Sequence, residues 1–266
     1  MFGKSITLFR PFGFAVRVDT SWIFIALLVT WSLASGVFPD HLPGYSPQAY
    51  WMMGIVGALG LFTSVVLHEL SHSLVARRFG IEMKGITLFI FGGVAEMGEE
   101  PPSPRAEFLV AGVGPLCSLA LSVIAFLLQQ ALAATPLDAL RAILAYLAAI
   151  NAVLAFFNLI PAFPLDGGRL LRAFLWARGG SLRKATRVTS NLGSGFGVIL
   201  VIIGVITFLL GGFVQGVWWV LIGLFLRGAA RHLCSGLNLV PIVGPLVGND
   251  YFLCGGRQFG FACSRR

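Results

Sequence analysis

Residues 50–72 read YWMMGIVGALGLFTSVVLHELSH, and this stretch decides the fold. No Asp, Glu, Lys or Arg occurs in it before Glu69. A helix rises 1.5 Å per residue, so about 20 apolar residues are needed to cross the roughly 30 Å of hydrocarbon in a bilayer. The stretch therefore predicts a membrane-spanning helix that carries two histidines and a glutamate near its end.

Other uncharged stretches of the chain are also long enough to cross a bilayer. The quoted helix falls mostly within the uncharged stretch 41–68. The other uncharged stretches are residues 20–39, 108–137, 142–165 and 188–226. The last of these is about twice as long as one crossing requires, and Gly211-Gly212 favours a turn within it. The sequence therefore predicts an all-α polytopic membrane protein with six transmembrane helices.

The composition of the chain excludes a soluble globular domain. Of its 266 residues, 57% are hydrophobic and 11% are charged, with a mean hydropathy of +0.86, whereas soluble domains contain about 25% charged residues. The net charge of +8 is also seen in nucleic-acid-binding proteins. With six spans, however, every Lys and Arg except Arg141 falls on one side of the membrane. This positive-inside bias predicts cytoplasmic termini and needs no nucleic-acid partner.

The chain divides into three expected regions, which are a cytoplasmic interfacial segment (1–20), a six-span membrane domain (21–230) and a cytoplasmic tail without an assigned role (231–266). Residues 84–97 surround a Gly-Gly turn and are too short to span, which predicts a β-hairpin that dips into the protein. After the fourth span, two prolines predict extended backbone, followed by a basic loop that begins at Arg169.

His68 and His72 carry the clearest chemical signal in the sequence. Residues four apart lie on the same side of a helix, so both imidazoles can reach one metal ion. Glu69 lies about 100° round the helix, where it can take a proton from a water that the metal activates. Ionisable residues inside a membrane segment are costly and usually functional. The pattern predicts a zinc hydrolase site with two histidine ligands and Glu69 as the general base.

A hydrolytic zinc site needs a third protein ligand. His41 falls in an external loop and His232 follows the last span, so neither is expected to reach the second helix. The carboxylates, Glu107 among them, have explanations as loop, helix-start, span-flanking or tail residues, with the exception of Asp166. Asp166 enters from the same side as the two histidines and is the predicted third ligand. The alternative is an Asp-Gly turn that caps the following helix.

Asn151 and Asn158 are seven residues apart on the predicted fourth span and share one of its faces. Asn158 could donate a hydrogen bond to the oxyanion that forms when the substrate peptide is attacked, or it could have a structural role. The residues alone leave both roles open. For Asn151 we expect an interhelical hydrogen bond.

In combination these motifs resemble the site-2 protease family of intramembrane zinc metalloproteases. The resemblance covers about residues 5 to 230. It is carried by His68-Glu69-Leu70-Ser71-His72, by Leu165-Asp166-Gly167 with Asn158 and Pro161 before it, by Gly114-Pro115, by Phe91-Gly92-Gly93-Val94-Ala95-Glu96, and by Phe12-Gly13 and Trp22.

The resemblance implies a role for each predicted site residue. His68, His72 and Asp166 would bind one Zn²⁺ per chain, with Glu69 as the general base. Asn158 would help to hold the substrate or the oxyanion. The implied reaction is hydrolysis of a peptide bond within or near a transmembrane segment.

The hairpin has an implied role in substrate binding. Phe91, Gly92, Gly93 and Val94 would pair with a locally unwound substrate as an added strand. The substrate is expected to be a transmembrane protein in the same bilayer, and an anti-sigma factor, a membrane-tethered regulator and a signal-peptide remnant all remain open. We expect a prokaryotic plasma membrane as the location.

Two features depart from the family pattern. The branch of the family that this chain most resembles often carries paired CBS domains after the last span, whereas residues 235–266 are too few for such a pair, and no PDZ insertion lies between the spans. We therefore expect a compact member without either domain. The alternatives are a metal transporter, which would place ionisable residues along several spans, and an inactive helix-binding adaptor, which would have no use for Glu69.

Overall fold

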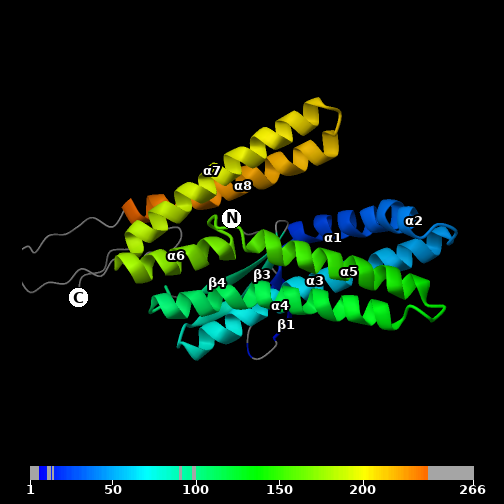
Figure 1. Cartoon of the computed structure of the whole chain (residues 1–266), viewed down its shortest axis with the longest axis horizontal. Coiled ribbons are helices and arrows are strands. Elements are labelled where there is room, and N and C mark those ends of the chain that lie inside the picture. Colours follow the sequence, from blue (N-terminus) through cyan, green and yellow to red (C-terminus); the bar gives the residue numbers. More distant parts are fainter. Residues whose placement is uncertain (1–5, 11–12, 14, 90–91, 98–99, 239–266) are drawn as a thin grey trace, which may run out of the picture.

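The computed structural model describes residues 6–10, 13, 15–89, 92–97 and 100–238 (Figure 1). The strands are β1 (Ile6–Phe9), β2 (Val16–Val18), β3 (Met83–Phe89) and β4 (Gly92–Met97). The helices are α1 (Ser21–Ser32), the π-helical turn η2 (Leu33–Val37), α2 (Phe38–His41), α3 (Pro47–Arg78), α4 (Pro104–Ala131), α5 (Asp138–Asn158), α6 (Asp166–Gly179), α7 (Leu182–Leu209) and α8 (Phe213–Asn238).

Six helical segments of the described chain are long and apolar enough to cross a membrane. They are Ser21–His41, which joins α1 to α2, then α3, α4, α5 and α7, and finally Phe213–Arg231 within α8. The predicted all-α, six-span architecture is confirmed, and the protein is an integral multi-pass membrane protein.

The long helix α3 has clear signals at both ends. The Ser46 side chain accepts a hydrogen bond from the backbone N–H of Ala49, and Pro47 occupies the first helical position, where its missing N–H costs nothing. At the other end Gly80 has a φ of +74°, and the N–H of Ile81 reaches back to Ala76 O over 3.2 Å. This left-handed residue stops the helix just beyond the histidine pair.

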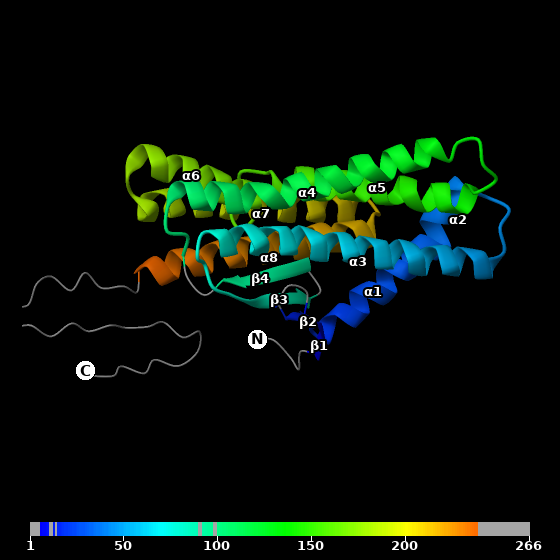
Figure 2. The ribbon, with the colours of Figure 1, turned by 90° about the horizontal axis from the view of Figure 1, so that it is seen from below.

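A four-stranded sheet in the order β1-β2-β3-β4 lies beside α3 (Figure 2). Strands β3 and β4 are antiparallel, with Thr87 opposite Val94, which confirms the predicted hairpin. Strand β2 pairs with β3 in parallel, with Val16 opposite Ile86, and β1 adds to β2 in antiparallel fashion. The sequence predicted no strand among residues 1–20, because three or four residues that pair with a distant segment leave no local pattern.

The sheet packs on the part of α3 that carries the two histidines. Val18, Ile86 and Leu88 are buried in one cluster with Leu70 of α3. Leu70 follows His68 by two residues, or about 200° round the helix. The sheet therefore covers the back of the helical turn that presents the imidazoles.

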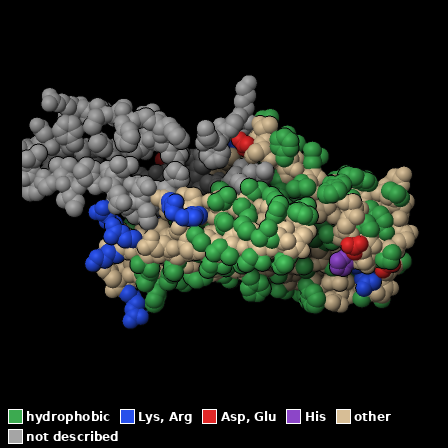
Figure 3. Space-filling model, turned by 90° about the horizontal axis from the view of Figure 1, so that it is seen from above, with side chains coloured by type: hydrophobic (Ala, Val, Ile, Leu, Met, Phe, Trp, Pro, Cys, Tyr) green, Lys and Arg blue, Asp and Glu red, His purple; other side chains and the backbone are tan. Residues whose placement is uncertain are grey.

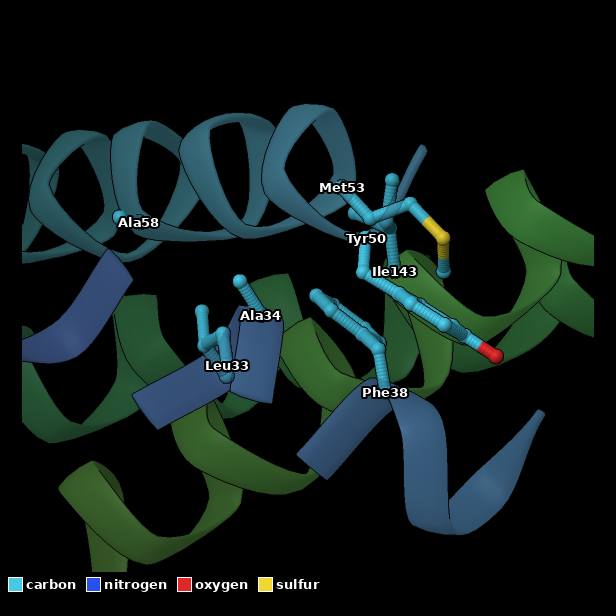
Figure 4. Close-up of a cluster of buried hydrophobic side chains, with 7 residues drawn as sticks. All are labelled: Leu33, Ala34, Phe38, Tyr50, Met53, Ala58 and Ile143. Atoms are coloured by element: carbon cyan, nitrogen blue, oxygen red, sulfur yellow. The ribbon is translucent and has the colours of Figure 1, made fainter. Parts of the chain in front are cut away.

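The opposite end of the bundle has its own apolar cluster, which lies between the first span, α3 and α5 (Figure 4). The Tyr50 hydroxyl donates to the carbonyl oxygen of Leu42 over 2.8 Å and so holds the loop between α2 and α3. The members of this cluster are Leu33, Ala34, Phe38, Tyr50, Met53, Ala58 and Ile143. These contacts fix the first span against the helix that carries the histidines.

The predicted basic loop from Arg169 onward is wrong, because this segment forms helix α6. Pro161 and Pro164 precede the helix and do not interrupt it. Its first residue is Asp166, whose negative charge is favourable at a helix N-terminus. Gly180, with a φ of +63°, ends the helix in the left-handed conformation.

Helices α7 and α8 form a close pair that follows α6 (Figure 1). A Cβ atom on Gly197 would lie 2.6 Å from Gly223 O, and one on Gly204 would lie 2.7 Å from Gly216 O. Gly197 and Gly204 therefore allow α7 and α8 to pack closely. Figure 3 shows apolar side chains covering the middle of this side of the molecule, with most of its Lys and Arg side chains at one end.

Candidate metal centre

The side chains of His68, His72 and Asp166 meet at one point inside the bundle. Their potential ligand atoms all lie within 4.8 Å of one another. The Nε2 atom of each imidazole is 3.1 Å from Asp166 Oδ2, and the two Nε2 atoms are 3.2 Å apart. The structure therefore brings together the three residues that the sequence selected as ligands, from α3 and from the first turn of α6.

The histidine rings are oriented by α4. His72 Nδ1 lies 2.6 Å from Val110 O, and it must donate because a carbonyl only accepts. In the neutral imidazole the lone pair is then on Nε2, which faces Asp166. His68 Nδ1 lies 2.9 Å from the Ser118 hydroxyl. Such partners fix the ring orientation that a metal ligand needs.

Gly114 provides the space that the two imidazoles occupy. A Cβ atom built on this residue would lie 2.2 Å from His72 Nε2 and 2.7 Å from His68 Nε2. Any side chain there would collide with both ligand nitrogens. Helix α4 thus comes close to the histidines at Gly114. In the sequence, this residue stands out only as part of the Gly114-Pro115 motif.

Asp166 is carried to the site by the segment that links α5 to α6. The N–H of Phe163 in this segment bonds to Thr189 O on α7 over 3.3 Å. Gly167 and Gly168 pack on the same segment, since a Cβ atom on Gly167 would lie 2.2 Å from Leu159 O. The link is therefore held closely on both sides, which fixes the first turn of α6.

The electrostatic surroundings keep the Asp166 carboxyl ionised. Burial raises the pKa of this carboxyl, but hydrogen bonds and positive charge from the imidazoles of His68 and His72, when these carry a proton on Nε2, outweigh burial, so the pKa lies below its ordinary value. An ionised carboxylate is the form that binds a metal ion.

The donor set and its spacing fit a zinc ion. Two imidazole nitrogens and one carboxylate oxygen are typical zinc ligands, and catalytic zinc sites have three protein ligands. For tetrahedral coordination with bonds of about 2.0 Å, ligand atoms would be about 3.3 Å apart. The observed separations of 3.1, 3.1 and 3.2 Å are close to that value.

Glu69 lies next to His68 on α3. It is partly buried and close enough to interact electrostatically with His68, His72 and Asp166. It is therefore beside the three-residue cluster without being one of its members.

The structure places the two asparagines differently. Asn151 is buried and donates from its side-chain nitrogen to Ser64 Oγ on α3 over 3.0 Å, which is the interhelical hydrogen bond expected for it. Asn158 is the last residue of α5 and donates to Leu154 O over 3.0 Å. It stands seven residues before the N-cap of α6, at the start of the link to Asp166.

The predicted hairpin residues are only partly within the described chain. Phe91 lies outside the described residues. Gly92, Gly93 and Val94 begin β4, which is the last strand in the sheet order.

Sequence reasoning missed Glu107 and Arg172. Glu107, interpreted as a helix-start residue, is 0% exposed in the first turn of α4. The Nε atom of Arg172 donates to its Oε1 over 2.6 Å. The sequence holds one hint, which is that Glu107, Val110, Gly114 and Ser118 recur at helical spacing.

The chain is similar to known proteins over most of its length. The family model described as Peptidase family M50 matches residues 56–138 and 130–204. These segments include the two histidines, Glu69, Asn158 and Asp166.

Two relatives are bacterial proteins named as zinc metalloproteases. Rip3 of Mycobacterium tuberculosis is 42% identical over 229 residues, which are 86% of this chain and 58% of that protein. The sll0528 protein of Synechocystis is 42% identical over 219 residues, or 81% of this chain and 56% of that protein. The chain thus spans somewhat more than half the length of these relatives.

A solved structure has a similar fold. It is the site-2 protease from Methanocaldococcus jannaschii, which matches with a TM-score of 0.57 and 29% sequence identity. The match covers 87% of this chain and 95% of that one.

Proposed function

The chain belongs to peptidase family M50, the site-2 protease family, and from this premise we propose that it is a zinc-dependent intramembrane endopeptidase. It would hydrolyse a peptide bond within or near a transmembrane segment of a membrane-bound substrate. The observation that carries the proposal is the convergence of His68, His72 and Asp166, whose ligand atoms lie within 4.8 Å of one another inside a six-span bundle.

In this proposal His68, His72 and Asp166 hold one Zn²⁺ per chain. When bound, the ion supplies Lewis-acid chemistry, which lowers the pKa of water and polarises a peptide carbonyl. The chain's own contribution is to present two oriented imidazoles and an ionised carboxylate from a site that is 3–8% exposed. The names of the two relatives support zinc as the ion.

Glu69 is the proposed general base. Its carboxylate takes a proton from the attacking water and passes it to the nitrogen of the leaving amine. Its place beside the cluster supports this role, because a base must be near the reacting water without occupying a ligand position.

Asn158 is proposed to donate a hydrogen bond to the substrate carbonyl. A side-chain amide has two N–H donors, and Leu154 O takes one of them. The other remains for a carbonyl that becomes negatively charged during the reaction.

The substrate is proposed to be a transmembrane protein that becomes locally extended, because helical carbonyls are hidden in internal hydrogen bonds. Phe91, Gly92, Gly93 and Val94 would pair with the extended segment. The edge position of β4 in the sheet order supports an added strand there. An anti-sigma factor, a membrane-tethered regulator and a signal-peptide remnant are the substrate classes to test.

We further propose a prokaryotic plasma membrane with both termini in the cytoplasm. The gathering of Lys and Arg side chains at one end of the face in Figure 3 supports this orientation. The bacterial and archaeal sources of the similar proteins support the location.

The test is a cleavage assay with purified protein and a membrane-spanning substrate in vesicles. Wild-type protein is expected to cleave, and chelation or Glu69→Gln is expected to abolish cleavage. Glu69→Gln should still bind zinc, which separates a lost base from a lost site. Cleavage by a folded Glu69→Gln variant would refute the assigned base.

A metal assay tests the third ligand independently. Asp166→Ala should lower the zinc content of purified protein to nearly that of His68→Ala. A zinc content equal to the wild-type value would remove Asp166 from the site. The cleavage assay also addresses the adaptor, which would bind the substrate without cleaving it, and zinc uptake into the same sealed vesicles would identify a transporter.

A further inference from the structure

A charged pair is buried between α4 and α6, close to the metal centre. Glu107 is 0% exposed and Arg172 is 5% exposed. Arg172 donates from Nε to Glu107 Oε1 over 2.6 Å, and its Nη2 atom pairs with the same oxygen. Two charges are costly to remove from water unless each is paired. The ion pair therefore links α6 to α4 inside the protein.

Glu107 lies on the face of α4 that orients both imidazoles. Glu107, Val110, Gly114 and Ser118 follow one another at intervals of three or four residues, which places them on one side of the helix. Val110 O and Ser118 Oγ are the partners of the histidine Nδ1 atoms, and Gly114 faces the Nε2 atoms. Glu107, at the N-terminal end of this face, therefore connects it to α6 through Arg172.

Arg172 connects this face to Asp166. Both residues belong to α6, of which Asp166 is the first residue, so a fixed Arg172 restrains the start of the helix. The Arg172 guanidinium carbon also lies 5.8 Å from the centre of the Phe163 ring. Phe163 belongs to the link that delivers Asp166, so Arg172, itself in the helix after the carboxylate, also contacts the segment before it.

We propose that Glu107 and Arg172 are positioning residues of the metal centre, whose ion pair holds α6 against α4 so that Asp166 meets the two oriented imidazoles. This inference rests on the proposed function, in which Asp166 is the third zinc ligand. A pair that only stabilised the fold would lower the thermal midpoint and leave the zinc affinity of the folded protein unchanged. Groups that orient metal ligands, in contrast, change metal affinity by about 10–100-fold.

The test uses the full chain in detergent micelles and measures its zinc Kd by competition with a chelator. Glu107→Gln is expected to raise the zinc Kd at least about tenfold. With a membrane-spanning substrate, the zinc-saturated variant is expected to have a lower kcat and a KM within about twofold of the wild-type value, because the substrate-binding surface is intact.

Gly204→Ala is the matched stability control. Its Cβ atom would lie 2.7 Å from Gly216 O, so the variant should disturb the α7–α8 contact and lower the thermal midpoint. Its zinc Kd should equal the wild-type value. A rise in Kd for Glu107→Gln that Gly204→Ala does not share supports positioning.

A second variant covers the case in which Glu107→Gln does not fold. The double variant Glu107→Gln, Arg172→Met removes both charges of the pair, so neither is left without the other. A raised zinc Kd in either folded variant supports the proposal, and wild-type zinc Kd and kcat in a folded variant overturn it. Failure of the unsubstituted protein to bind zinc and to cleave would overturn the proposed function itself, and this result is seen before any variant is compared.

Discussion

A Cβ atom on Gly114 would lie 2.2 Å from the Nε2 atom of His72. The helix α4 therefore contacts the imidazole at the nitrogen that faces Asp166, and not only at the Nδ1 atom that bonds to Val110 O. This contact makes the ring position sensitive to a single methyl group on α4.

Gly114→Ala is expected to reduce zinc affinity at least about tenfold and to abolish most cleavage, because the new methyl group displaces both imidazoles. Gly112→Ala is the control two residues earlier on the same helix. Its Cβ atom would meet only Leu170 Cδ2, at 3.7 Å, which is an ordinary contact. Zinc titration of both variants checks the prediction, and equal zinc affinity in the two would contradict it.

Ser118→Ala is expected to weaken zinc binding by about tenfold, because His68 Nδ1 loses the hydroxyl partner 2.9 Å away that orients the ring. Ser122→Ala removes a comparable hydroxyl one turn later, which donates to Ala148 O over 2.7 Å. Each change should lower the free energy of unfolding by about 1 kcal/mol. Only Ser118→Ala should change the zinc Kd, so a shared change in Kd would show that the effect is general.

Gly193→Ala is expected to reduce cleavage strongly through displacement of the link before Asp166. A Cβ atom at this position would lie 1.8 Å from Phe163 O, so the link or α7 has to move. Gly195→Ala, on the same helix, would meet nothing within 4 Å and should retain wild-type cleavage. Initial cleavage rates in vesicles and zinc content, measured for both variants, test this prediction. An active Gly193→Ala variant would show that the link before Asp166 tolerates the displacement.

Asn158→Ala is expected to lower kcat by about 10²–10³-fold while zinc content stays at the wild-type value, because the change removes an oxyanion donor and no ligand. Asn151→Ala should instead lower thermal stability, since it removes the hydrogen bond to Ser64. A kcat for Asn158→Ala near that of the wild type would assign Asn158 to structure alone.

Much of the architecture could be predicted from the sequence because its determinants are local. The length of each uncharged stretch gives the spans. The neighbouring positions of His68 and His72 follow from helical geometry alone. Asp166 could be selected because the other carboxylates have explanations as loop, helix-start, span-flanking or tail residues.

The remaining parts of the site depend on tertiary contacts that have no local pattern. Val110 acts through its backbone carbonyl, which every residue possesses, so its identity gives no signal. Glu107 and Arg172 are 65 positions apart, and the sequence predicts only a helix start for the first and a basic loop for the second, because charged residues next to a span usually face water. For the same reason α6 was interpreted as a loop.

Asp166 follows His68 by 98 positions, and this separation sets the order in which the site can be assembled during synthesis. A nascent chain that ends before α6 contains two imidazoles but lacks the carboxylate that meets them. The histidine helix then enters the bilayer with α5 and with α4, whose contacts match the Nδ1 atoms, before ribosomal elongation supplies the carboxylate that faces the Nε2 atoms. In the proposed function, capture of the ion is therefore a late event in biogenesis, and a chain that ends before α6 is inactive.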